Sequence, residues 1–195
     1  MDKHHVDRLY LLVGRIATDF SSIEQLWYLI FTCVLNTTPR DIADVIFSQF
    51  KTGRQQRQLI LELINCFFLD PKHPLKLEIQ DLAEQTKLAA NRRNDAVHSI
   101  IQFLGFVVPP RVIAQGIFKR NKLSDKQIEP ELCDLYRTVA RLEMKIQELR
   151  LKMIEFITPQ DSTLARDKQQ IANAKQGLEQ LLDSDPILRV LEGRS

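Results

Sequence analysis

Hydrophobic residues recur every three or four positions along the N-terminal part of the chain. This spacing is typical of an α-helix that buries one face, and it predicts a long first helix from about Asp2 to Leu35. Trp27 belongs to this stripe, so we expect it in the core rather than stacked on a nucleic-acid base. The apolar positions are Val6, Leu9, Val13, Ile16, Phe20, Ile23, Trp27, Ile30 and Val34.

Proline and glycine divide the next part of the chain into three further predicted helices. Pro39 suits the first position of a helix, Gly53 interrupts the pattern, and a helix could not cross the proline-containing loop 70–74. The expected helices are 39–49, 54–68 and 75–98.

The sequence changes character after His98. Two short runs rich in β-branched and aromatic residues, 100–108 and 111–119, lie on either side of Pro109-Pro110. Such runs are typical of extended segments. We therefore expect a small extended or β-hairpin insertion after the fourth helix.

A second long apolar stripe runs from Leu132 to Phe156 with helical spacing over three heptads. It fits a coiled coil or a member of a bundle, and the other amphipathic helices of the chain favour the bundle. Beyond Pro159 the pattern weakens to a polar helix at 162–183. An apolar patch at 187–191 follows, and it must cover the protein itself or dock on a partner.

These elements predict an all-α fold: a helical bundle of four to five main helices with the insertion and a C-terminal helical tail. We expect a bundle domain at 1–157 and a polar helical tail at 158–195. Only 6 of the 195 residues are glycine, which disfavours architectures that turn often, such as sandwiches and barrels.

Composition and charge indicate the cellular compartment and limit how the protein could bind nucleic acid. Cys33, Cys66 and Cys133 are isolated and odd in number, which disfavours a disulfide framework and a zinc site and fits a reducing cytoplasm. The chain lacks a signal-peptide pattern and its longest apolar run is too short to cross a bilayer, so we expect a cytoplasmic protein without membrane contact. A net charge of +2 gives no overall attraction for nucleic acid, so phosphate binding would need a local cluster.

One window, Asn91 to His98, combines arginine, amide, carboxylate and histidine side chains. Histidine exchanges protons near neutral pH and arginine binds phosphate with two parallel hydrogen bonds, so the window suits phosphodiester chemistry. Asn94 and His98 share a helix face and Asn94 could orient the imidazole. Arg93 and His98 are about 140° apart around an ideal helix, so they converge only if the helix ends or loosens near His98.

The sequence Arg93-Asn94-x-x-x-His98 resembles the R-x(4–6)-H motif of the higher eukaryotes and prokaryotes nucleotide-binding (HEPN) family. The segments FSSIEQLWYLIF and FSQFKTGRQQRQLILEL, and the order of helices over about residues 5–157, are also similar. The resemblance implies a homodimer whose two motifs share one cleft and act as a metal-independent endoribonuclease without a cofactor. His98 would then transfer protons, Arg93 would stabilise the phosphate and Asn94 would orient His98.

Other polar residues have weaker assignments. Glu24 matches an acidic position of some family members, and Arg92 offers an alternative R-x(5)-H register. Asp95 is a supporting residue that could instead form a surface ion pair with Arg92. Weaker candidates for RNA binding are Lys51, Arg54, Arg57, Lys119, Arg120 and Lys122.

Three functions fit the sequence at this point. The first is an RNA-cleaving toxin or defence enzyme, restrained by a protein inhibitor or antitoxin. The second is a dimeric module of the same fold that binds a nucleotide or RNA, or acts as an adaptor, without cleavage. The third is an interaction protein that docks through its second long stripe and its terminal apolar patch. As an alternative to any role in function, Arg93 and His98 could do no more than cap the end of a helix.

Overall fold

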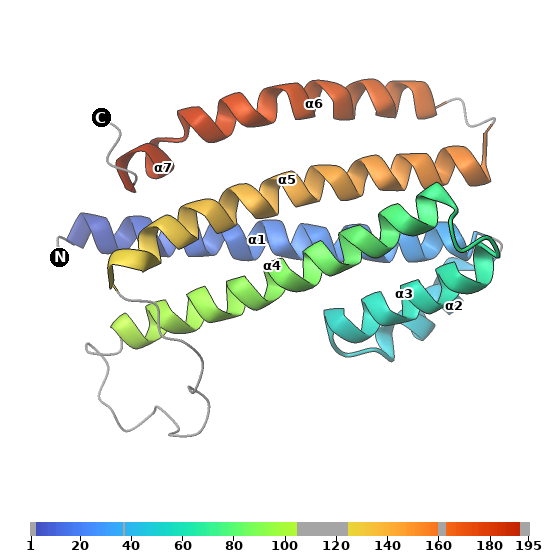
Figure 1. Cartoon of the computed structure of the whole chain (residues 1–195), viewed down its shortest axis with the longest axis horizontal. Helices are drawn as coiled ribbons and strands as arrows, with labels where there is room; N and C mark the ends of the chain where they lie inside the picture. The colour runs from blue at the N-terminus through green and yellow to red at the C-terminus, as the bar shows by residue number, and fades with distance from the viewer. Residues whose placement is uncertain (1–2, 37, 105–124, 160–162, 192–195) are drawn as a thin grey trace.

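The structure is a computed structural model that describes residues 3–36, 38–104, 125–159 and 163–191 (Figure 1). All regular secondary structure in these ranges is α-helical, which confirms the predicted all-α bundle. The helices are α1 (Lys3–Val34), α2 (Arg40–Ser48), α3 (Gly53–Phe67), α4 (Pro74–Leu104), α5 (Asp125–Ile157), α6 (Leu164–Ser184) and α7 (Pro186–Leu191).

Helix α1 contributes one buried face to the core, as its apolar stripe predicts. Ile16, Phe20 and Ile23 are almost completely buried. Trp27 is also buried, and its indole Nε1 donates a hydrogen bond of 3.2 Å to Thr86 Oγ1 on α4. The polar atom of the largest core side chain is therefore satisfied, and the predicted core position of Trp27 is confirmed.

Helix α5 packs along both α1 and α4 (Figure 1). Its stripe is buried from Leu132 to Met153, whereas Phe156 at the end of the stripe is half-exposed. The stripe therefore belongs to the chain's own core, as the presence of other amphipathic helices led us to expect.

Helix α4 continues past His98 to Leu104, so the prediction that it ends at His98 is wrong. The run Ser99 to Leu104 contains neither glycine nor proline, and its β-branched residues disfavour a helix by only a few tenths of a kcal/mol each. A helix that is already formed can therefore extend through them. The rest of the expected hairpin, including 111–119, lies outside the described residues, and so does the basic group Lys119, Arg120 and Lys122.

Helix α3 begins at a capping box. Thr52 Oγ1 accepts a hydrogen bond from the Gln55 amide at 3.2 Å, and Gln55 Oε1 accepts one from the Thr52 amide at 3.2 Å. These reciprocal bonds satisfy two otherwise free amides and fix the first residue of the helix at Gly53. Helix α3 packs against α1 and α4.

Helices α6 and α7 lie on the outer side of α5 (Figure 1). Leu182, Leu188 and Leu191 are buried and join the main hydrophobic core. The terminal apolar patch therefore covers the protein's own bundle. The division into 1–157 and 158–195 stays a prediction; its boundary falls between α5 and α6.

None of the helices in the described parts of the chain has the length and apolar character to cross a membrane.

Candidate functional site

Arg92 links α4 to α5. Its Nε lies 2.7 Å from Glu131 Oε1 and its Nη2 lies 2.7 Å from Asp134 Oδ2. The hydrogen bond that Arg92 donates to Glu131 is the main cause of its raised pKa. Arg92 forms its ion pairs with residues of α5, so its guanidinium stabilises the packing of α4 on α5. Arg93 is therefore the better candidate for binding a phosphate.

Arg93 lies on another side of α4, against α1. Its guanidinium carbon is 4.5 Å from the centre of the Phe20 ring, which is a cation–π contact. Its Nη2 and Nε donate to Asn94 Oδ1 at 3.0 Å and 3.3 Å. Asn94 therefore positions Arg93 in this structure, and its predicted action on His98 stays a prediction.

Glu24 and Arg57 converge on the first turn of α3. A Cβ atom added to Gly53 would lie 2.7 Å from Glu24 Oε1 and 3.1 Å from Arg57 Nη1. Such distances are below van der Waals contact, so the absence of a side chain at Gly53 lets the carboxylate and the guanidinium come this close. Arg57 is only 7% exposed.

Electrostatic effects connect this group to Arg93. Burial lowers the pKa of Arg57, the Glu24 carboxylate opposes that shift, and the Arg93 charge lowers the pKa further. Three helices thus bring together two guanidinium groups and one carboxylate. Among the residues predicted from sequence, the structure gathers Glu24, Arg57, Arg93 and Asn94 in one region.

The position of His98 follows from the register of α1 and α4. Thr86 contacts Trp27, and Arg93, seven residues further along α4, contacts Phe20, seven residues back along α1. The two helices therefore run antiparallel in constant register, which places position 98 level with about position 15. Because α4 is continuous there, positions 93 and 98 stay about 140° apart around the helix axis.

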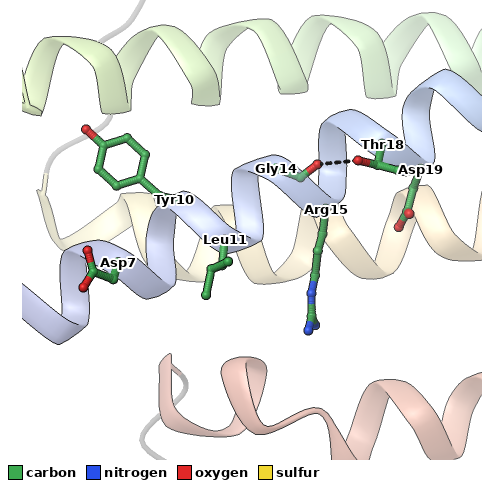
Figure 2. A pocket seen from close by; sticks show the side chains of 7 residues that line it. All are labelled: Asp7, Tyr10, Leu11, Gly14, Arg15, Thr18 and Asp19. Atoms are coloured by element: carbon green, nitrogen blue, oxygen red, sulfur yellow. Dashed lines mark hydrogen bonds between the residues drawn. The ribbon is translucent and has the colours of Figure 1, made fainter.

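A hollow of about 680 Å³ lies on α1 at this level (Figure 2). Figure 2 shows Tyr10 pointing toward α4 and Arg15 extending toward α6 and α7, where it pairs with Asp185 at 2.5 Å. Tyr10 and Leu11 are more than half exposed. This surface was not predicted from the sequence, although both residues are large apolar side chains that lie off the buried stripe. The lining residues are Asp7, Tyr10, Leu11, Gly14, Arg15, Thr18 and Asp19.

A second, smaller cavity of about 180 Å³ lies between α3 and α4. Arg54, Arg57 and Lys87 contribute positive charge to its wall, and Glu84 contributes a carboxylate that pairs with Lys87 at 3.0 Å. Lys51 does not line it; the Lys51 ammonium donates to the Ser48 carbonyl oxygen at 3.0 Å, at the end of α2. Of the basic residues 51, 54 and 57, only the last two therefore face this cavity.

The described ranges contain no group of three or more His, Cys, Asp or Glu side chains that could hold a metal ion. Cys33, Cys66 and Cys133 are not joined in disulfides, and burial raises the pKa of Cys33.

Comparisons with protein-family models, curated proteins and solved structures found no match. The resemblance to the HEPN family therefore depends on the motif at Arg93 to His98 and on the order of the helices.

Proposed function

We propose that this protein is a metal-independent endoribonuclease of the HEPN type. The observation that carries the proposal is the position of Arg93, which is held by Phe20 and Asn94 beside Arg57 and Glu24. A guanidinium that is already positioned can stabilise charge on a phosphate at little reorganisation cost.

In the proposed reaction a ribose 2′-oxygen attacks the adjacent phosphorus and the bond to the 5′-oxygen breaks. His98 accepts the proton of the 2′-hydroxyl, and a second histidine donates a proton to the leaving 5′-oxygen. Arg93 stabilises the negative charge on the phosphate oxygens during the attack. The products carry a 2′,3′-cyclic phosphate and a 5′-hydroxyl group.

A homodimer would supply the second histidine. The half-exposed Tyr10 and Leu11 and the open space at Gly14 support a contact between two copies through α1, because no described atom fills these positions. This face lies level with position 98, so a second copy would bring its own His98 near the first. We place the enzyme in the cytoplasm, in a toxin or defence setting with a protein inhibitor.

The test is an RNA-cleavage assay in EDTA with wild type, Arg93→Ala and His98→Ala. We expect each variant to cleave at least about 100-fold more slowly, the range for loss of an acid–base group or a charge-stabilising donor. Arg141→Ala is the matched control, because Arg141 is also a surface arginine but pairs with Glu179 on α6. Intact RNA with wild type, or unchanged cleavage by His98→Ala, would contradict the proposal.

A non-catalytic RNA-binding module is the second candidate. The continuous α4 supports it, because positions 93 and 98 on different sides of a regular helix do not converge within one chain. In that case Arg93→Ala weakens RNA binding while no cleavage product forms with any variant.

A further inference from the structure

Arg57 is a buried cation with unused hydrogen-bond donors. The residue is 7% exposed, yet its guanidinium makes no hydrogen bond or ion pair within 4 Å to any residue in the described ranges. None of its nitrogens is both buried from solvent and without a partner, and Arg57 lines the cavity between α3 and α4. A guanidinium that has lost most of its water without gaining partners costs free energy. Binding of an anion would supply the missing hydrogen-bond partners of this guanidinium.

The nearby charges define what that ligand must be. Glu24 attracts the Arg57 guanidinium, and Arg93 repels it. An anion in the cavity that Arg57 lines would offset part of this positive charge and accept hydrogen bonds from the Arg57 guanidinium. Phosphate fits this requirement, since its oxygens accept several bonds in the forked geometry of arginine.

The space beside Arg57 is large enough for such a group. The cavity between α3 and α4 measures about 180 Å³, which equals the volume of roughly six water molecules in the liquid. Arg54 and Lys87 in its wall add positive charge, of which Glu84 offsets one unit, so the wall with Arg57 keeps a net positive charge. The mouth of this cavity would therefore attract a polyanion.

We propose that Arg57, which lines the cavity between α3 and α4 together with Arg54 and Lys87, binds one phosphate group of an RNA chain there. Before the phosphate arrives, the Glu24 carboxylate lies close to the Arg57 guanidinium at Gly53. The identity of the ligand as RNA rests on the proposed function, whereas the phosphate site depends only on the cavity that Arg57 lines and on the approach of Glu24 and Arg57 at Gly53. Gly53 is part of the site because a side chain there would push the Glu24 carboxylate and the Arg57 guanidinium apart.

The binding test uses an oligonucleotide that cannot be cleaved. A fluorescein-labelled 2′-O-methyl uridine 12-mer lacks the attacking hydroxyl, and its anisotropy reports affinity in EDTA. We expect Arg57→Met to weaken binding at least about 10-fold and to reduce the salt dependence by about one phosphate contact. Arg141→Met, the matched control on the α5–α6 face, should change affinity less than about threefold.

A second variant changes affinity in the opposite direction. Glu24→Gln removes the internal anion that competes for Arg57, so we expect it to tighten binding at least about threefold. A purely structural contact between Glu24 and Arg57 would give no tightening. This variant also keeps the proposal testable if Arg57→Met does not fold.

Two results would overturn the inference. They are unchanged affinity in a folded Arg57→Met, whatever its Tm, and an equal or weaker affinity of Glu24→Gln. Direct binding of inorganic phosphate without any oligonucleotide binding would assign the site to a free phosphate and overturn its assignment to RNA. Failure of the enzyme proposal is distinguishable from failure of the phosphate site, because cleavage is measured on RNA whereas the 2′-O-methyl oligonucleotide cannot be cleaved and reports binding alone.

Discussion

Asp19 on α1 and Glu143 on α5 show how burial changes single residues. Both side chains are half-buried, and burial raises the pKa of each carboxyl group. Arg15 lowers the pKa of Asp19, whereas the Asp19 charge raises the pKa of Glu143 further. Because each folded pKa exceeds the unfolded one, the folded state binds protons more readily. The two groups therefore reduce stability as the pH rises from their unfolded to their folded pKa values.

We expect Glu143→Gln to increase the free energy of unfolding at pH 7. The gain should stay below about 1 kcal/mol because both carboxylates reach water, and it should disappear below about pH 4, where Glu143 is protonated in both states. Urea denaturation at the two pH values measures it. Glu62→Gln is the control, since Glu62 is an exposed carboxylate on α3. A loss of stability at pH 7 would contradict the expected sign.

At the scale of elements, α6 and α7 are held to α5 by two kinds of contact. The leucines that enter the core contribute most, because a fully buried leucine stabilises by several kcal/mol relative to alanine. Ion pairs between exposed or partly exposed side chains also join α6 to α5. Each such pair contributes little to stability. The apolar contacts therefore determine whether α6 and α7 stay docked. The ion pairs are Arg141–Glu179, Lys175–Glu148 and Lys168–Glu155.

Leu188→Ala should destabilise the docking of α6 and α7 by about 2–4 kcal/mol, because Leu188 is completely buried. Hydrogen exchange should show faster exchange in these two helices and little change in α1. Val190→Ala is the control, as Val190 is half-exposed on the same helix. Unchanged protection from hydrogen exchange in α6 would mean that the ion pairs alone keep α6 and α7 docked on α5.

At the scale of the whole molecule, the proposed reaction needs two copies of the chain. The α1 face with Tyr10, Leu11 and Gly14 offers apolar side chains and open space, as an interface between identical surfaces requires. The net charge of +2 is small, so two copies do not repel strongly and RNA attraction depends on the local arginines.

We expect Leu11→Glu to convert a dimer into a monomer, because it would bury two carboxylates at the symmetry axis. Light scattering after size exclusion measures the mass, and RNA cleavage should fall at least about tenfold while the monomer stays folded. Leu69→Glu is the control, since Leu69 is 90% exposed outside this face. A Leu11→Glu variant that stays dimeric would exclude this interface.

Much of the fold could be predicted from sequence because helix periodicity is a local property. The apolar stripes that contain Trp27 and Leu132 identify the buried faces of α1 and α5 without any information about neighbouring helices. The end of α4 was predicted wrongly, because β-branched residues after His98 favour a strand only weakly and a formed helix can extend through them.

Part of the candidate site could also be predicted from sequence, and part depended on the tertiary structure. The sequence by itself determined that arginine, amide and histidine occupy one window of a helix, since order along the chain needs no tertiary information. Only the tertiary structure decided that Arg92 pairs with α5 while Arg93 faces α1, and that Arg57 is buried beside Glu24 at Gly53. The physical reason is that burial and charge contacts depend on which helices become neighbours, and those neighbours come from distant parts of the chain.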